Sequence, residues 1–140
     1  MVGFDVRAPR CDSLPETLSC NRECISIMRE ILPQDYKVYK HCLVSDQEAR
    51  LWVENFPTTK FGINGLLFQN VSLQNFVKTA SVEDLFTETD APFLAASFNV
   101  KASLPRHVFR VAEKIAQIKQ RPLNEIAPTL NSTIQNFYKV

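Results

Sequence analysis

Residues 86–94 read "FTETDAPFL" and place two carboxylates, Glu88 and Asp90, directly after an apolar run. Pro92 follows the second carboxylate within two residues. A hydrophobic segment that ends in acidic residues is typical of a strand whose end builds a site at the mouth of a parallel sheet. The stretch therefore predicts an α/β fold with parallel strands and a functional site at the end of this strand.

Strands and helices alternate along the chain around this stretch. Apolar and alternating patterns predict strands over residues 37–44, 59–68 and 82–90. Apolar residues at helical spacing predict helices over residues 19–32, 45–56, 71–80, 108–118 and 123–138. Strands that are separated by crossover helices pair in parallel with right-handed connections, so this order predicts one parallel sheet with helices packed on it.

Capping residues and prolines mark the ends of several elements. Residues 7–18 carry two prolines and mixed charges, which is typical of a loop. Ser19 or Asn21 is available as the N-cap of the helix that follows. Ser45 and Glu48 form a capping box at the start of the next helix.

The composition is that of a single domain with a core of ordinary size. The chain has 140 residues, a formal net charge of +1 and 45% hydrophobic residues, so it has no strong attraction to nucleic acid or anionic membranes. No apolar run approaches the roughly 20 residues that span a bilayer, and the first ten residues lack the apolar region of a secretion signal. We therefore expect no membrane partner and a cytoplasmic or nuclear location.

The cysteines Cys11, Cys20, Cys24 and Cys42 form no familiar metal-binding motif. Cys20 and Cys24 are one helical turn apart, but no CxxC pair exists. In a chain without a secretion signal we expect buried, inert thiols rather than disulfides, with a structural zinc site as the alternative.

Polar side chains follow each of the three predicted strands. His41 follows the first strand, Asn64 the second, and Glu88 and Asp90 the third, while Gly62 and Gly65 mark close backbone approach or a bend. Because functional groups gather at the carboxyl ends of parallel strands, we expect His41 and Asp90 to converge. A neutral imidazole and a carboxylate suit a divalent metal such as Zn, Mn or Mg, which could polarise a phosphoryl oxygen and activate a water.

A structural interpretation of the same residues stays open. His41 could serve as a structural hydrogen-bonding group, and Asp90 could cap the turn before Pro92. Two ligands are also fewer than the three protein ligands of a typical catalytic zinc site. The other histidine, His107, lies beside Arg106 at a helix start and is expected at the surface.

The string "ETDAPF" at residues 88–93 resembles the eighth-strand motif of the TatD family, metal-dependent deoxyribonucleases with an amidohydrolase-type barrel. "DYKVYKHCL" at residues 35–43 is similar to the sixth-strand segment of that family, which carries a ligand histidine. "FPTTKFGINGLLF" at residues 56–68 resembles the seventh strand, and "VAEKIAQIKQRPLNEIA" at residues 111–127 resembles the C-terminal helices. The resemblance covers roughly residues 16–140 and is closest to the larger animal members.

This resemblance implies the C-terminal half of a TIM-type (β/α) barrel. Residues 1–18 would be an N-terminal remnant and loop, and residues 19–140 the half-barrel. It implies DNA as the substrate and a divalent metal, Mg, Mn or Zn, as the cofactor. His41 and Asp90 would be metal ligands, and Asp90 would also be the catalytic residue that orients the attacking water. Glu88 would support the strand end rather than bind metal.

The chain also departs from the family pattern. The His-x-His pair of the first strand is absent, Met1 stands where the family has a glutamate, and Ser19 stands where it has a histidine. The resemblance thus implies a TatD-like hydrolase of DNA phosphodiester bonds with a depleted metal site; the alternative is a catalytically inactive barrel remnant that acts as a binding or scaffold module. A half-barrel leaves open strand edges, which favour self-association. The sequence is compatible with a fragment, a short isoform, an incomplete gene model or part of an assembly.

Overall fold

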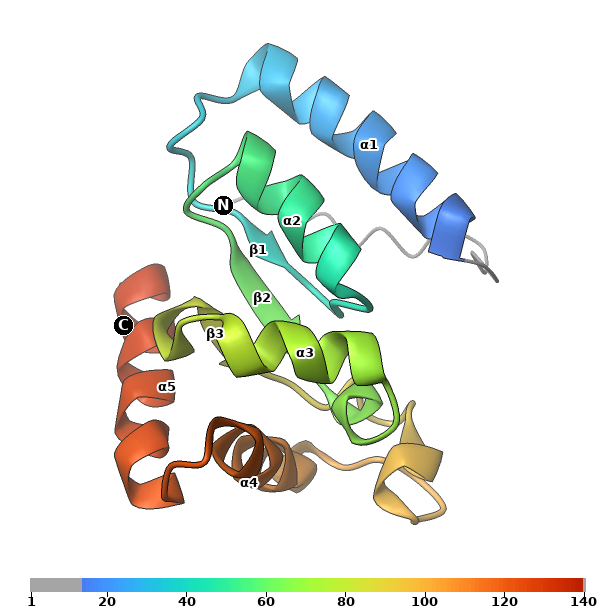
Figure 1. Ribbon diagram of the computed structural model, residues 1–140, viewed down its shortest axis with the longest axis vertical. Coiled ribbons are helices and arrows are strands. Elements are labelled where there is room, and N and C mark those ends of the chain that lie inside the picture. Colours follow the sequence, from blue (N-terminus) through green and yellow to red (C-terminus); the bar gives the residue numbers. More distant parts are fainter. Residues whose placement is uncertain (1–13, 140) are drawn as a thin grey trace.

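A three-stranded parallel sheet lies at the centre of the computed structural model, which describes residues 14–139 of the chain (Figure 1). Its strands lie side by side in chain order and are β1 (Tyr39–Lys40), β2 (Lys60–Ile63) and β3 (Leu85–Thr87). The register pairs Lys40 with Phe61, and Phe61 with Leu85. Both pairings are parallel, so the predicted α/β fold with parallel strands and crossover helices is confirmed.

Helices connect and cover these strands. The α-helices of the described residues are α1 (Leu14–Ile31), α2 (Asp46–Asn55), α3 (Val71–Thr79), α4 (Val108–Lys119) and α5 (Leu123–Tyr138). Short 3-10 helices are η1 (Gly65–Phe68), η2 (Val82–Asp84), η3 (Ala95–Phe98) and η4 (Pro105–His107). Each α-helix packs against the next one along the chain, and Figure 1 shows α5 standing beside β3. None of the helices in residues 14–139 has the length and apolar character needed to cross a bilayer.

The first helix begins earlier than its sequence pattern predicts. We expected a loop through residue 18, but α1 begins at Leu14, so the predicted loop is wrong for its last five residues. Pro15 is compatible with this start because the first turn of a helix has no internal partner for a backbone N–H. Neither Ser19 nor Asn21 is therefore an N-cap, and the predicted domain boundary after residue 18 falls inside α1.

The strands are shorter than their apolar runs. β2 ends at Ile63 because Asn64 caps a 3-10 helix there, its side-chain oxygen accepting a hydrogen bond from the backbone N–H of Leu66 at 3.0 Å. β1 ends before Cys42, whose φ of 52° lies in the left-handed region and turns the chain out of the sheet. Apolar periodicity alone does not locate such ends, since the residues beyond them are buried as well.

The hydrophobic core lies between one face of the sheet and helices α1 to α5. Phe61, Ile63 and Leu85 point into it with 1% exposure or less. Phe86, the neighbour of Leu85, is also buried but lies outside this core, because successive side chains of a strand point to opposite faces. On that second face Phe86 packs against Phe137 of α5, with ring centroids 5.2 Å apart.

Candidate metal centre

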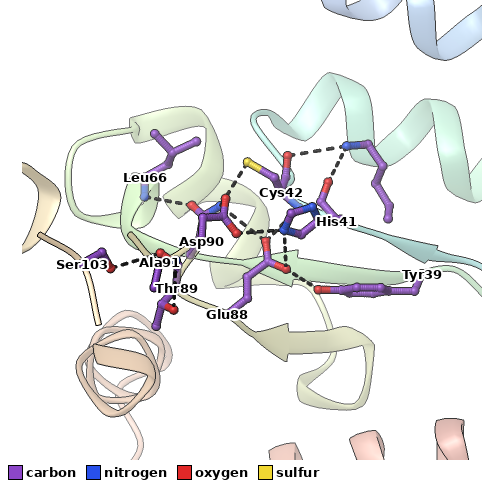
Figure 2. Close-up of polar contacts among 11 residues, drawn as sticks. Tyr39, His41, Cys42, Leu66, Glu88, Thr89, Asp90, Ala91 and Ser103 are labelled. Carbon is purple, nitrogen blue, oxygen red and sulfur yellow. Dashed lines mark hydrogen bonds and ion pairs between the residues drawn. The ribbon is translucent and has the colours of Figure 1, made fainter. Parts of the chain in front are cut away.

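The three strand ends converge at one edge of the sheet, and their polar side chains meet there (Figure 2). His41 Nε2 lies 2.8 Å from Asp90 Oδ1 and 3.4 Å from Glu88 Oε2. One ligand atom from each of these residues lies within 4.8 Å of the other two. The predicted convergence of His41 and Asp90 is therefore seen in the structure, with Glu88 beside them.

Asn64 joins the two carboxylates from the end of β2. Its side-chain nitrogen donates to Asp90 Oδ2 at 3.0 Å and lies 3.4 Å from Glu88 Oε1. Because Asn64 is completely buried and its oxygen is used by Leu66, the amide has one orientation that satisfies all these partners. Asn64 thus fixes the spacing between the acidic groups.

Glu88 lies across β2, above a residue without a side chain. A Cβ on Gly62 would stand 2.6 Å from Glu88 Cδ, so only glycine leaves room for the carboxylate in this position. Tyr39 donates its hydroxyl hydrogen to Glu88, and the backbone N–H of Cys42 donates to Glu88 Oε1 at 2.8 Å. The sequence suggested a supporting role for Glu88 at its strand end. The structure shows this carboxylate bridging all three strands.

Two residues of the site have left-handed backbone. Cys42 and Asp90 both have φ of 52°, in a region that favours glycine or, less strongly, asparagine and aspartate. Such a conformation costs of the order of 1 kcal/mol and persists where surrounding contacts determine it. In both places the bend follows a strand. It directs the Cys42 N–H toward Glu88 and the Asp90 carboxylate toward Asn64.

Burial and neighbouring groups shift the pKa values of the two carboxyl groups in opposite directions. Burial alone would raise the pKa of Asp90, but the hydrogen bond and charge of His41 outweigh it and hold that pKa below its ordinary value. For Glu88, burial is the larger effect and raises its pKa, although the hydrogen bond from Tyr39 opposes the rise. Asp90 is therefore the stronger acid of the two carboxyl groups.

The thiol next to His41 is held in its protonated form. Burial, followed by the charge of Asp90, raises the pKa of Cys42 to about 12, which keeps the thiol protonated at neutral pH. The Cys42 sulfur lies 3.1 Å from the side-chain nitrogen of Asn64 and so belongs to the wall of the site.

An open cleft of about 470 Å³ leads to the three side chains. Besides His41, Glu88 and Asp90, its lining residues are Thr87, Thr89, Ala91, Pro105 and Val108. The cleft lies between the end of β3 and the start of α4, and the His41 side chain is 37% exposed to it. The imidazole and the carboxylates can thus be reached from solvent.

The structure places some of the predicted residues away from the centre and corrects the prediction for His107. Ser19 lies exposed on α1 and does not join the centre, while Met1 lies outside the described residues. His107 is buried, not at the surface as predicted, because its Nδ1 accepts a hydrogen bond from the backbone N–H of Leu104 at 3.1 Å. Tyr39 was not predicted as a residue of the site, although its position two residues before His41 places it on the same strand face.

The cysteines of the described residues, Cys20, Cys24 and Cys42, form no disulfide. None belongs to a group of three metal-binding side chains within residues 14–139. Cys24 lies 3.8 Å from the sulfur of Met28 on the same helix, and burial raises its pKa. Cys11 lies outside the described residues.

Comparison with known proteins gives consistent matches in sequence and in structure. The model of the family described as "TatD related DNase" matches residues 17–139. An uncharacterized metal-dependent hydrolase of Mycoplasma pneumoniae is 33% identical over 107 residues, which are 71% of this chain and 41% of that protein.

Three solved structures share the fold. A TatD homologue from Escherichia coli K12 has a TM-score of 0.68 and 20% identity, and the match covers 86% of this chain and 47% of the homologue. An uncharacterized amidohydrolase from Saccharomyces cerevisiae has a TM-score of 0.61 and 18% identity, covering 75% and 41%. A TatD family hydrolase from Entamoeba histolytica has a TM-score of 0.59 and 17% identity, covering 91% and 58%. The chain therefore spans between 41% and 58% of the length of these relatives.

Proposed function

The chain belongs to the TatD-related DNase family, and on that basis we propose that it carries the residual site of a metal-dependent hydrolase of DNA phosphodiester bonds. The observation that carries this proposal is the meeting of His41 and Asp90 at 2.8 Å beside Glu88, at the carboxyl ends of parallel strands. We assign residues 19–140 to the C-terminal half of the family barrel, with motifs most similar to the larger animal members.

The side chains of the site fit a divalent cation. One imidazole nitrogen and two carboxylates within 4.8 Å of one another are a donor set suited to Mn²⁺, Zn²⁺ or Mg²⁺. His41, Glu88 and Asp90 would hold such an ion. When bound, it would supply Lewis-acid stabilisation of phosphoryl charge and lower the pKa of a water ligand.

The chain's own groups would then orient the water. Asp90 has a lowered pKa, so its carboxylate is ionised at neutral pH and can accept a hydrogen bond from a water in the cleft. Asn64 holds the second Asp90 oxygen, and Tyr39 holds Glu88, so neither carboxylate has to reorganise. In this proposal the open cleft would receive a segment of the DNA strand.

The site is depleted relative to that of the family. Three protein ligands suffice for one catalytic ion, whereas a two-metal mechanism needs more. Ser19, which corresponds to a family histidine, is exposed on α1 and outside the centre. That observation favours the second candidate function, a catalytically inactive barrel remnant that acts as a binding or scaffold module. A cytoplasmic or nuclear location and self-association through strand edges belong to the same proposal.

Calorimetric titration with Mn²⁺, Mg²⁺ and Zn²⁺, combined with hydrolysis of labelled DNA, tests these alternatives. We expect saturable binding of about one ion per chain, lost in His41→Ala and in Asp90→Asn. Binding with metal-dependent hydrolysis that the same substitutions abolish supports the enzyme. Binding without hydrolysis supports the inactive remnant, and no saturable binding at millimolar metal refutes the proposed centre.

A further inference from the structure

A buried carboxylate lies behind the metal centre, on the helix that follows β1. The Glu48 side chain is 1% exposed, and its oxygens accept hydrogen bonds from Val44 N at 2.9 Å and Asn21 Nδ2 at 2.8 Å. The capping-box prediction holds only in part: Ser45 Oγ accepts from Glu48 N at 3.0 Å, whereas the Glu48 carboxylate bonds other groups. The position of this carboxylate therefore needs an explanation other than helix capping.

The partner of Glu48 is Lys40, the residue before His41. Lys40 Nζ lies 3.1 Å from Glu48 Oε1, donates to the carbonyl oxygen of His41 at 2.7 Å, and lies 3.5 Å from that of Cys42. These two carbonyls belong to the bend in which Cys42 has a φ of 52°. The ammonium thus connects the buried carboxylate to the backbone segment that carries the imidazole.

We propose that Lys40 and Glu48 are positioning residues, which hold the bend after β1 so that the His41 imidazole reaches Asp90. A left-handed Cys42 is unfavourable by itself and needs fixed contacts on both sides. Glu88 holds the Cys42 N–H from the cleft side at 2.8 Å, and Lys40 holds the carbonyl groups from the helix side. The backbone of His41 and Cys42 is therefore held by hydrogen bonds from both sides.

The network extends to the first helix. Trp52 Nε1 donates to Asn21 Oδ1 at 2.8 Å, and Asn21 Nδ2 donates to Glu48. Asn21 lies on α1 and Trp52 on α2, so the packing of these two helices fixes the Glu48 carboxylate, which in turn fixes Lys40. In this way the placement of His41 depends on a helix that contributes no residue to the centre.

The test uses the double substitution Lys40→Met with Glu48→Gln, which removes the ammonium without leaving a buried charge unpaired. Glu48→Gln alone is a milder second variant, because glutamine can still accept from Val44 N. The matched control is Lys60→Met with Asp84→Asn. Lys60, the first residue of β2, and Asp84, the last residue of η2, form a lysine–carboxylate pair 2.7 Å apart at the amino ends of the strands, away from the bend after β1. Circular dichroism and thermal melting report whether each variant folds.

Long-range ¹H–¹⁵N spectra of the metal-free protein report the ring nitrogens of its two histidines, and His107 serves as the internal reference. We expect the His41 signals to shift or broaden in both Lys40/Glu48 variants, with His107 unchanged and neither affected by the control. The proposal is overturned by unchanged His41 signals in a folded variant. Equal changes at both histidines also overturn it, because they indicate general loosening.

A second readout is the affinity for Mn²⁺, and it alone rests on the proposed function. Residues that orient a metal ligand typically contribute 10–100-fold to affinity, so we expect the double variant to lose about tenfold and the control almost nothing. A folded double variant with wild-type affinity counts against the positioning role. If the unsubstituted protein itself binds no Mn²⁺, the proposed function fails, while the histidine spectra still decide the positioning.

Discussion

Gly62 and Asp90 are the residues on which the geometry of the centre most directly depends. Gly62 leaves the space in which Glu88 crosses β2, and Asp90 provides the carboxylate with the lowered pKa. Neither residue acts through the hydrophobic core, so substitutions here should change the site with a modest effect on folding.

Substitution of Gly62 by alanine should displace Glu88. The new Cβ would stand 2.6 Å from Glu88 Cδ, and the carboxylate would have to leave its donors, Tyr39 and Cys42. We expect a loss of about 1–2 kcal/mol in the free energy of unfolding, measured by urea denaturation. In a Glu88→Ala background the same substitution should cost almost nothing. Equal costs in both backgrounds would show that Glu88 is not the group displaced.

Asp90→Asn should destabilise the metal-free protein in a pH-dependent way. Asparagine tolerates the left-handed backbone, so the substitution removes charge without new strain. Because the folded-state pKa of Asp90 is lowered, its contribution is fully present above the unfolded value of about 3.9 and is lost as pH falls through the lower folded value. We expect Asp90→Asn to lower the free energy of unfolding by about 1 kcal/mol at pH 7, since His41 is partly exposed, and this difference to shrink as the pH falls below the unfolded value. A difference that stays constant from pH 7 to pH 2 would contradict this assignment.

At the scale of elements, α5 contributes Ile126 and Leu130 to the core, and its last turn packs on the second face of the sheet. Its last turn brings Phe137 and Tyr138 against Phe86 of β3, with ring centroids 5.2 and 6.1 Å from that of Phe86. Tyr39 completes this aromatic group from β1, 5.1 Å from Phe86. Because Tyr39 also donates a hydrogen bond to Glu88, the packing of α5 on Phe86 helps to fix Tyr39 and, through it, Glu88.

Phe137→Ala should therefore weaken both the fold and the site. Removing the edge-to-face contact with Phe86 and the apolar area around it should cost about 2 kcal/mol, less than for a fully buried phenylalanine. Asn136→Ala, an exposed position on the same turn, is the matched control and should change stability little. Urea denaturation followed by tryptophan fluorescence measures both, and similar values for the two variants would exclude a structural role for the aromatic group.

At the scale of the whole molecule, residues 14–139 hold one hydrophobic core cluster and one group of metal-binding side chains, although the chain spans 41–58% of the length of its relatives. Within residues 14–139, helices cover the core face of the sheet, and the last turn of α5 covers the other face around Phe86. The site lies at the carboxyl ends of the strands, so an ion bound there would connect the end of β1 to the end of β3, and Asn64 joins the end of β2 to the same carboxylates.

Such an ion should stabilise the folded chain as a unit. A ligand that binds only the folded state adds about 2.7 kcal/mol at 100 times its Kd, or roughly 5–10 °C in melting temperature for a domain of this size. Scanning calorimetry with increasing MnCl2 should show this rise for the unsubstituted chain and none for His41→Ala. A similar rise in both proteins would mean that the ion binds elsewhere.

The sequence by itself determined the order of elements and the strand ends that carry polar groups. Helical periodicity located α2, α3, α4 and α5 within a few residues, because each has one apolar face. The acidic residues after β3 and the histidine after β1 were recognisable from their positions, since parallel strands bring their carboxyl ends to one edge. The start of α1 was missed because a proline in the first turn of a helix reads as a loop residue.

Only the tertiary structure decided which of these groups touch and what fixes them. The role of Glu88 depends on the missing side chain of Gly62, which lies 26 residues away on the neighbouring strand. The use of Glu48 to hold Lys40, instead of to cap its own helix, depends on the packing of α1 against α2. Contacts of this kind arise between segments distant in sequence, so neither periodicity nor local propensity contains them. They exist only once burial has brought the elements together.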